Sequence, residues 1–290
     1  MATDWYQTRP GIFLDYLEWR GDLSFWSVPM NEVDALILAW LSFLPLDDIV
    51  PAKVGRTITV RGACRHVLQG VPEFHDSRDL EFCRRIAETR RFGELEFSGF
   101  RNNVDVEQQK QFAAVTIHMG EGDALVAFRG TDGTLVGWRE DFNMTLRNSV
   151  PAQVSAANYL LEVAAAVPGR ISLAGHSKGG NLSVYASVYA PGDVQDRLID
   201  IYSFDGPGFH EDVFNHAGFA RVRDRIHVLV PQTSVVGMMM GHEVPYTVVH
   251  STESGLRQHD PYSWEVMGPE FVTLDRTTTS SRFVDQSLKD

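Results

Sequence analysis

Residues 175–179 read Gly-His-Ser-Lys-Gly, a spacing in which a serine between two glycines can act as a nucleophile. They follow the apolar run 171–174 and precede residues 181–186, a segment that suits a helix. A strand, a sharp turn and a helix form the context of a nucleophile elbow, in which the flanking glycines leave room for neighbouring backbone. We therefore expect Ser177 to project its hydroxyl into an open pocket. A solvated serine in a glycine-rich turn is the alternative.

A serine hydroxyl is a weak nucleophile near neutral pH, so acyl transfer needs a histidine base and a carboxylate that orients it. Three histidines, His242, His250 and His259, lie near or after the last expected strand. We expect His259 to be the base, because residues 258–262 form a loop soon after that strand ends, where catalytic groups gather in parallel sheets. His250 lies within the expected strand and His242 precedes it, and both remain alternatives.

The acid is harder to place. The expected strand 226–230 is followed by Pro-Gln-Thr-Ser, which offers no carboxylate. Asp205 directly follows the expected strand 199–204 and begins an Asp-Gly-Pro-Gly turn that would hold its side chain at the edge of the sheet. We predict Asp205 as the orienting acid, with a purely turn-forming role as the alternative. Asp260 is less favoured, because it adjoins His259 and would have to fold back on its neighbour.

Acyl transfer also needs hydrogen-bond donors directed at the developing oxyanion. The backbone N–H of Lys178, the residue after the nucleophile, is the first expected donor. We expect the second to be the N–H of Thr131, in the Phe-Arg-Gly-Thr-Asp segment that ends the expected strand 124–128. A β-turn in which Arg129 pairs with a nearby acid is the alternative for that segment. For the Lys178 side chain we expect solvation, with attraction of an anionic substrate group as the functional alternative.

The pattern of elements predicts an α/β fold with a mainly parallel central sheet and helices on both faces. We expect residues 1–105 to form a helical region that packs on the core or caps it, with helices at 31–44 and 78–91. Residues 106–290 form the catalytic core, and we expect one compact domain overall, since 290 residues and 43% hydrophobic content allow a substantial core. The elements expected after residue 105 are strands at 113–118, 124–128, 170–174, 199–204, 226–230 and 246–250, and a helix at 154–167.

Composition limits the partners. The formal charge of −12 argues against nucleic acid and anionic membrane surfaces. The two cysteines, Cys64 and Cys83, build neither a disulfide framework nor a metal motif, and no metal or organic cofactor is expected. The apolar run 35–45 is too short to span a bilayer, so no stable membrane insertion is expected. The first residues lack the charge pattern of a secretory signal, which predicts a cytoplasmic location. The oligomeric state stays open.

Several motifs resemble those of known proteins. Residues 128–131 (Phe-Arg-Gly-Thr), followed by Trp138 and Asp141, with the serine elbow after the next expected strand, resemble the fungal-type class 3 lipases of the α/β-hydrolase superfamily. The nearer resemblance is to the DUF2974 or Mbeg1-like family of bacterial lipase-like proteins. It rests on the runs 175–182 (Gly-His-Ser-Lys-Gly-Gly-Asn-Leu), 204–209 (Phe-Asp-Gly-Pro-Gly-Phe), 234–238 (Ser-Val-Val-Gly-Met) and 258–261 (Gln-His-Asp-Pro).

This resemblance implies an α/β-hydrolase fold, a Ser/Asp/His mechanism and an ester or lipid-like substrate, with Thr131 at the position of the lipase oxyanion residue. One departure stands out. Class 3 lipases carry an aspartate after the penultimate strand, where residues 230–234 here read Val-Pro-Gln-Thr-Ser. Either Asp205 takes over that role from one strand earlier, or the triad is incomplete.

Two functions follow from these alternatives. The first is a serine hydrolase that cleaves a short- or medium-chain carboxylic ester or a lipid-like ester, with thioesterase or acyltransferase chemistry open to the same residues. The second is a binding or scaffold protein that keeps the fold without turnover. For residues 235–241 (Val-Val-Gly-Met-Met-Met-Gly) we expect a core helix, with a mobile lid that accepts acyl chains as the alternative.

Overall fold

The chain folds around a large mixed β-sheet, as a computed structural model shows for residues 10–70, 74–131, 137, 140, 143–144 and 149–277. The strand order is β1-β2-β3-β4-β5-β6-β7-β8-β11. Neighbouring strands from β4 to β8 run parallel, whereas β1 to β4 pair antiparallel and β11 is antiparallel to β8. The predicted α/β fold is therefore confirmed, with the parallel part at the centre of the sheet.

The strands are β1 (Ile58–Thr59), β2 (Glu96–Asp105), β3 (Lys110–Gly120), β4 (Asp123–Phe128), β5 (Ile171–His176), β6 (Leu198–Phe204), β7 (Ile226–Pro231), β8 (Tyr246–Val249) and β11 (Thr273–Leu274), with β9 (Val266–Met267) and β10 (Glu270–Phe271) forming a separate pair. The helices include α1 (Phe13–Arg20), α2 (Glu32–Trp40), α3 (Val60–Gln69), α4 (Asp79–Glu88), α6 (Pro151–Ala166), α7 (Lys178–Tyr189), α8 (Gly192–Gln195), α9 (Glu211–Phe214) and α10 (Ala217–Val222). Short 3₁₀ turns are η2 (Leu41–Phe43), η3 (Arg223–Arg225), η4 (Gly255–His259) and η5 (Pro261–Ser263).

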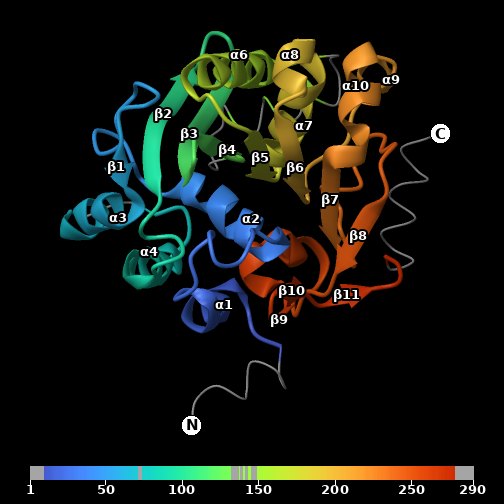
Figure 1. The fold of residues 1–290 in the computed structure, drawn as a ribbon. Coiled ribbons are helices and arrows are strands. Elements are labelled where there is room, and N and C mark those ends of the chain that lie inside the picture. Colours follow the sequence, from blue (N-terminus) through green and yellow to red (C-terminus); the bar gives the residue numbers. More distant parts are fainter. Residues whose placement is uncertain are drawn as a thin grey trace.

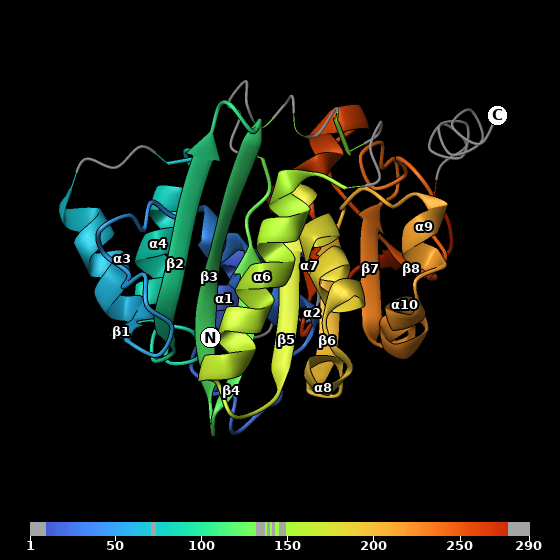
Figure 2. The same cartoon turned by 90° about the horizontal axis from the view of Figure 1, so that it is seen from above.

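Helices cover both faces of the sheet (Figures 1 and 2). Successive residues of β4 point to opposite faces, as the period of a strand requires. Leu125 and Ala127 join the core that includes α1 to α4, whereas Val126 and Phe128 join the core under α6, α7 and α10. Such a strand, buried on both sides, is apolar throughout, which is why the parallel centre of the sheet is easily recognised in the sequence.

Helix α2 connects the N-terminal part to the sheet, since it packs against β4, β5 and β6. It begins at Asn31, whose side chain accepts from the backbone N–H of Asp34 at 2.9 Å. Asp34 is fully buried, and its Oδ2 accepts from Arg91 Nη2 at 2.5 Å. This ion pair connects α2 to the segment after α4. The N-terminal region also contributes β1 and β2 to the sheet. The proposed division at residues 105 and 106 remains a prediction.

Residues 235–241 do not form the expected core helix. They form turns and bends between β7 and β8, with Met238 buried and Met239 and Met240 half-buried. The N–H of Gly237 in this segment donates to a side chain of the site described below. Three adjacent methionines here pack a loop, which flexible thioethers do as readily as they fill a helix interface.

Candidate active site

Ser177 occupies a strained turn between β5 and α7. Its backbone dihedrals are φ 58° and ψ −131°, a region that L-residues rarely adopt. Its N–H donates to the carbonyl of Phe204 at the end of the neighbouring strand β6, at 2.9 Å. The residue that sequence spacing marks as a nucleophile therefore lies at the carboxyl edge of the sheet, in a conformation that the surrounding structure has to hold.

Two glycines allow strand β4 and its following loop to approach this turn. A Cβ at Gly179 would lie 2.1 Å from the carbonyl oxygen of Phe128, closer than any side chain permits. A Cβ at Gly130 would lie 2.7 Å from the carbonyl oxygen of His176 and 3.1 Å from the Cβ of Ser177. The loop after β4 thus passes directly beside the serine, and only glycine fits these contacts.

Asp205 and His259 are joined by a hydrogen bond. His259 Nδ1 lies 2.6 Å from Asp205 Oδ2, so that Nδ1–H donates to the carboxylate and Nε2 is left as the acceptor of the neutral ring. Asp205 is fully buried and has φ 49°, directly after β6. Its other oxygen accepts from Ser234 Oγ at 2.5 Å and from the Gly237 N–H at 3.1 Å. The structure therefore brings together the two residues that the sequence paired across 54 positions.

The other candidates for base and acid have partners elsewhere. Asp260 accepts from Arg78 Nη2 at 2.6 Å, so its carboxylate is directed away from His259. His250 Nδ1 pairs with Glu265 Oε2 at 2.5 Å. His242 lies beside Gly208, whose added Cβ would be 3.0 Å from His242 Nε2. The geometry thus favours His259 and Asp205 over these alternatives.

Ser234 lies in the segment that follows strand β7. Its hydroxyl donates to Asp205, while Gln232, two residues earlier, exchanges two hydrogen bonds of 2.8 Å with the backbone of Ser251. The segment after β7 therefore supports a carboxylate that comes from β6. Sequence reasoning noted Ser234 only as part of a motif and assigned it no contact.

His176, immediately before the serine, contacts His259 twice. Its Nε2–H donates to the main-chain carbonyl of His259 at 2.7 Å, and the two ring centroids are 4.6 Å apart. Burial, and secondarily the imidazole of His259, hold the pKa of His176 well below its ordinary value, so the ring is neutral. Sequence reasoning missed this role; the available signal was a histidine in the last position of a buried strand.

The expectation of a solvated Lys178 side chain is wrong, because it is 1% exposed. Its ammonium group donates to Glu140 Oε2 at 3.1 Å, to Gln111 Oε1 at 2.5 Å and to the Gln111 carbonyl at 2.9 Å. Glu140 also accepts from the backbone N–H groups of Gln111 and Ala152, each at 2.9 Å. A buried lysine requires such pairing, and here it anchors the residue that follows the nucleophile.

Thr131 follows Gly130 in the loop beside the serine and is half-buried. Trp138 and Asp141 lie outside the described residues. Across the described part of the chain, no group of three His, Cys, Asp or Glu side chains is arranged to hold a metal ion. Within the same residues, no helix combines the length and apolar character that a bilayer span requires.

The parallel strands β4 to β8, with a strained serine turn after β5 and a carboxylate and histidine from later loops at the same edge, define an α/β-hydrolase fold. Within that class, the chain belongs to the Mbeg1-like family, whose model matches residues 86–290. No curated protein sequence matches the chain significantly.

Several solved lipase structures are similar to this chain at low sequence identity. M37 lipase is 14% identical, with 73% of this chain and 70% of that chain covered and a TM-score of 0.44. The lipase of Rhizomucor miehei, in a propeptide complex, is 13% identical, with coverages of 76% and 68% and a TM-score of 0.44. A triacylglycerol lipase with a serine protease triad at its catalytic centre is 13% identical, with coverages of 59% and 70% and a TM-score of 0.37.

Proposed function

We propose that the protein is a serine hydrolase that cleaves carboxylic esters of short or medium chain length, or lipid-like esters. The observation that carries this proposal is the Asp205–His259 hydrogen bond of 2.6 Å at the same sheet edge as the strained Ser177 turn. A carboxylate that fixes the Nδ1–H tautomer leaves Nε2 of the same ring free of a proton, as a general base requires.

In this mechanism Ser177 Oγ attacks the carbonyl carbon of the ester while His259 Nε2 takes the hydroxyl proton. The same proton passes to the leaving oxygen, the alcohol departs, and an acyl-enzyme on Ser177 remains. Water then attacks the acyl carbon and gives a proton to His259; the bond between the acyl carbon and Ser177 Oγ breaks, His259 returns the proton to Oγ, and the carboxylic acid leaves. Asp205 keeps the imidazole oriented and stabilises its cationic form.

The backbone N–H groups of Lys178 and Thr131 are the proposed oxyanion donors, each contributing about 3 kcal/mol in such sites. Two structural features support this assignment. Lys178 is the first residue of α7, where N–H groups and the helix dipole favour negative charge. Gly130 places the loop leading to Thr131 against the Cβ of Ser177.

Labelling with a fluorophosphonate, followed by mass spectrometry of the adduct, tests the proposal. We expect an adduct on Ser177 that disappears in Ser177→Ala. Ser187→Ala is the control, because Ser187 is a fully buried serine of helix α7, which follows Ser177, and its variant should label like the wild type. A panel of p-nitrophenyl esters and thioesters then defines the acyl group. A folded protein that neither labels nor turns over any of them would contradict the proposal and favour a binding protein.

A further inference from the structure

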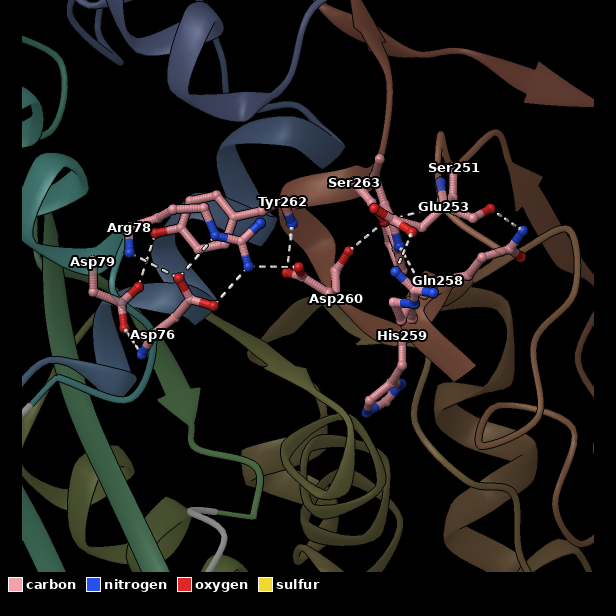
Figure 3. Close-up of polar contacts among 12 residues, drawn as sticks. Asp76, Arg78, Asp79, Ser251, Glu253, Gln258, His259, Asp260, Tyr262 and Ser263 are labelled. Atoms are coloured by element: carbon pink, nitrogen blue, oxygen red, sulfur yellow. Dashed lines mark hydrogen bonds and ion pairs between the residues drawn. The ribbon is translucent and has the colours of Figure 1, made fainter. Parts of the chain in front are cut away.

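The loop that carries His259 is held from outside by residues of the N-terminal region. His259 ends η4, and Asp260 and Tyr262 follow it. Arg78 Nη2 donates to Asp260 Oδ2 at 2.6 Å, and Tyr262 Oη–H donates to Asp79 Oδ1 at 2.8 Å. Figure 3 shows both contacts on one side of the loop, while the imidazole of His259 is directed away from them.

Asp79 is the centre of this contact. Its side chain is fully buried at the first position of α4. Oδ1 accepts from Trp40 Nε1 at 2.7 Å as well as from Tyr262, and Oδ2 accepts from the backbone N–H of Asp76 at 2.9 Å. Burial raises its pKa, and the hydrogen bonds from Trp40, Asp76 and Tyr262 act in the opposite direction. A buried acceptor with three donors fixes all three partners, because losing any one of them is costly.

Arg78 contacts the same loop at two residues, Asp260 and Tyr262. Its guanidinium lies 4.3 Å from the centroid of the Tyr262 ring, over its face. The same group holds Asp76 through two bonds, Nε to Oδ1 at 2.8 Å and Nη2 to Oδ2 at 2.6 Å, besides its bond to Asp260. A planar guanidinium can stack on an aromatic ring and hydrogen-bond carboxylates at the same time, which the ammonium group of lysine cannot do.

Trp40 connects these contacts to the proposed base. Its ring packs edge-on against Tyr262 and against His176, each with centroids 5.5 Å apart. His176 in turn donates to the main chain of His259. His259 is thus held by its own carbonyl on one side and by the residues that follow it on the other.

We propose that Arg78 and Asp79 are positioning residues for His259. Together with Trp40, Asp260 and Tyr262 they form a unit, here called the Asp79 clamp, that fixes the height and direction of the His259 loop over the sheet. The inference rests on the proposed function in taking His259 as the base. It makes the N-terminal region a part of the catalytic apparatus, beyond any role as a cover of the pocket.

The cleanest test removes one oxygen atom. Tyr262→Phe deletes the hydroxyl bound to Asp79 and keeps the ring. Tyr159→Phe is the matched control, because Tyr159 is equally buried at 3% exposure and its hydroxyl bonds Thr116 and the Gly99 carbonyl, on the face covered by α6. We expect Tyr262→Phe to lower kcat for a p-nitrophenyl ester at least about tenfold with KM unchanged, since a misplacement of about 1 Å can cost about 100-fold. Tyr159→Phe should keep the wild-type kcat at a similar loss of thermal stability.

A readout independent of turnover is the pair of ring ¹⁵N chemical shifts of His259 in histidine-labelled protein. They should move in Tyr262→Phe and stay in place in Tyr159→Phe. Arg78→Lys, at a side chain that is 42% exposed and so tolerant of change, should move them in the same direction to a smaller extent. If the wild type turned over no ester but the His259 ring shifts still moved in Tyr262→Phe, the proposed function would be contradicted and the clamp supported. Wild-type shifts in both Tyr262→Phe and Arg78→Lys would overturn the clamp, and so would a loss of kcat without any change in shift.

Discussion

The Nε2–H of His176 donates to the main-chain carbonyl of His259 at 2.7 Å, across 83 residues of sequence. The residue before the proposed nucleophile therefore holds the residue proposed to activate it. The two rings also pack against each other at an interplanar angle of 37°, so the elbow and the His259 loop are in direct contact. This relationship makes the preceding histidine a positioning group, distinct from the base itself.

We expect His176→Phe to lower kcat and to destabilise the fold by about 1–3 kcal/mol, because the buried carbonyl of His259 loses its donor. His176→Gln, whose amide nitrogen can reach a similar point, should retain more of both. Ester kinetics and urea unfolding of the two variants measure this. Equal behaviour of the Phe and Gln variants would show that the hydrogen bond has no role.

The pH dependence of stability should report His176 as well. Its pKa in the fold lies well below the value of about 6.5 that it has in the unfolded chain. The unfolded chain therefore binds the extra proton first as pH falls, and stability drops by up to about 1.4 kcal/mol per pH unit below pH 6.5 until the folded-state pKa is reached. As pH falls from 7.5 to 5, the free energy of unfolding of the wild type should decrease more than that of His176→Gln, whose side chain does not titrate. Parallel curves for the two proteins would refute this.

Asp205→Asn should lower kcat by about four orders of magnitude, since the amide no longer selects the Nδ1–H tautomer of His259. The chain offers a control on strand β6, which ends just before Asp205, because Asp200 of β6 pairs with His227 Nε2 of β7 at 2.9 Å. Asp200→Asn should turn over esters like the wild type. If both variants, or neither, lost activity, Asp205 would not have the proposed role.

Ser234→Ala removes a donor from the Asp205 carboxylate and leaves the Gly237 N–H in place. We expect a loss of about tenfold in kcat, equivalent to one hydrogen bond to a charged group. Thermal unfolding of the same variant separates this effect from loss of fold. A wild-type kcat would mean that the backbone donor of Gly237 suffices to orient Asp205.

Lys178→Met leaves Glu140 buried without its cation and should cost about 3–5 kcal/mol of unfolding free energy. The surface pair Arg221 and Asp196 is the comparison, because both side chains are largely exposed and Arg221→Met should unfold close to the wild type. Urea unfolding of both variants measures these changes in unfolding free energy. A Lys178→Met protein as stable as the wild type would show that the buried pair is dispensable.

The parallel half of the fold could be predicted from the sequence because its strands are buried on both faces and read as short apolar runs. The expected strand at 226–230 and β7 (Ile226–Pro231) agree to within a residue, and the expected helix at 31–44 appears as α2 and η2. Strand β2 was not expected. Its sequence contains Gly99, Asn102 and Asn103, and its register shifts between Ser98 and Arg101, so the two-residue alternation that marks a strand is absent.

The polar contacts of the site were less accessible to sequence reasoning. The proximity of Asp205 and His259 follows from a rule of parallel sheets, that loops at the carboxyl ends of strands meet. The burial of Lys178 follows from no local pattern, since its partners Gln111 and Glu140 lie on other segments and a lysine in a first helical turn is usually solvated. The same holds for Arg78 and Asp79, whose contacts reach the other end of the chain.

Arg78 and Asp260 are separated by 182 residues, and Asp79 and Tyr262 by 183. Contacts of such separation close late, since the chain between them must be ordered first. During synthesis at ~5–20 residues per second, Trp40 and Asp79 would emerge roughly 10–40 s or more before their tyrosine partner. Until then the carboxylate of Asp79 stays hydrated and the His259 loop does not exist. Incomplete chains should therefore not hydrolyse esters. Ester hydrolysis would report that the N-terminal region and the His259 loop have come into contact.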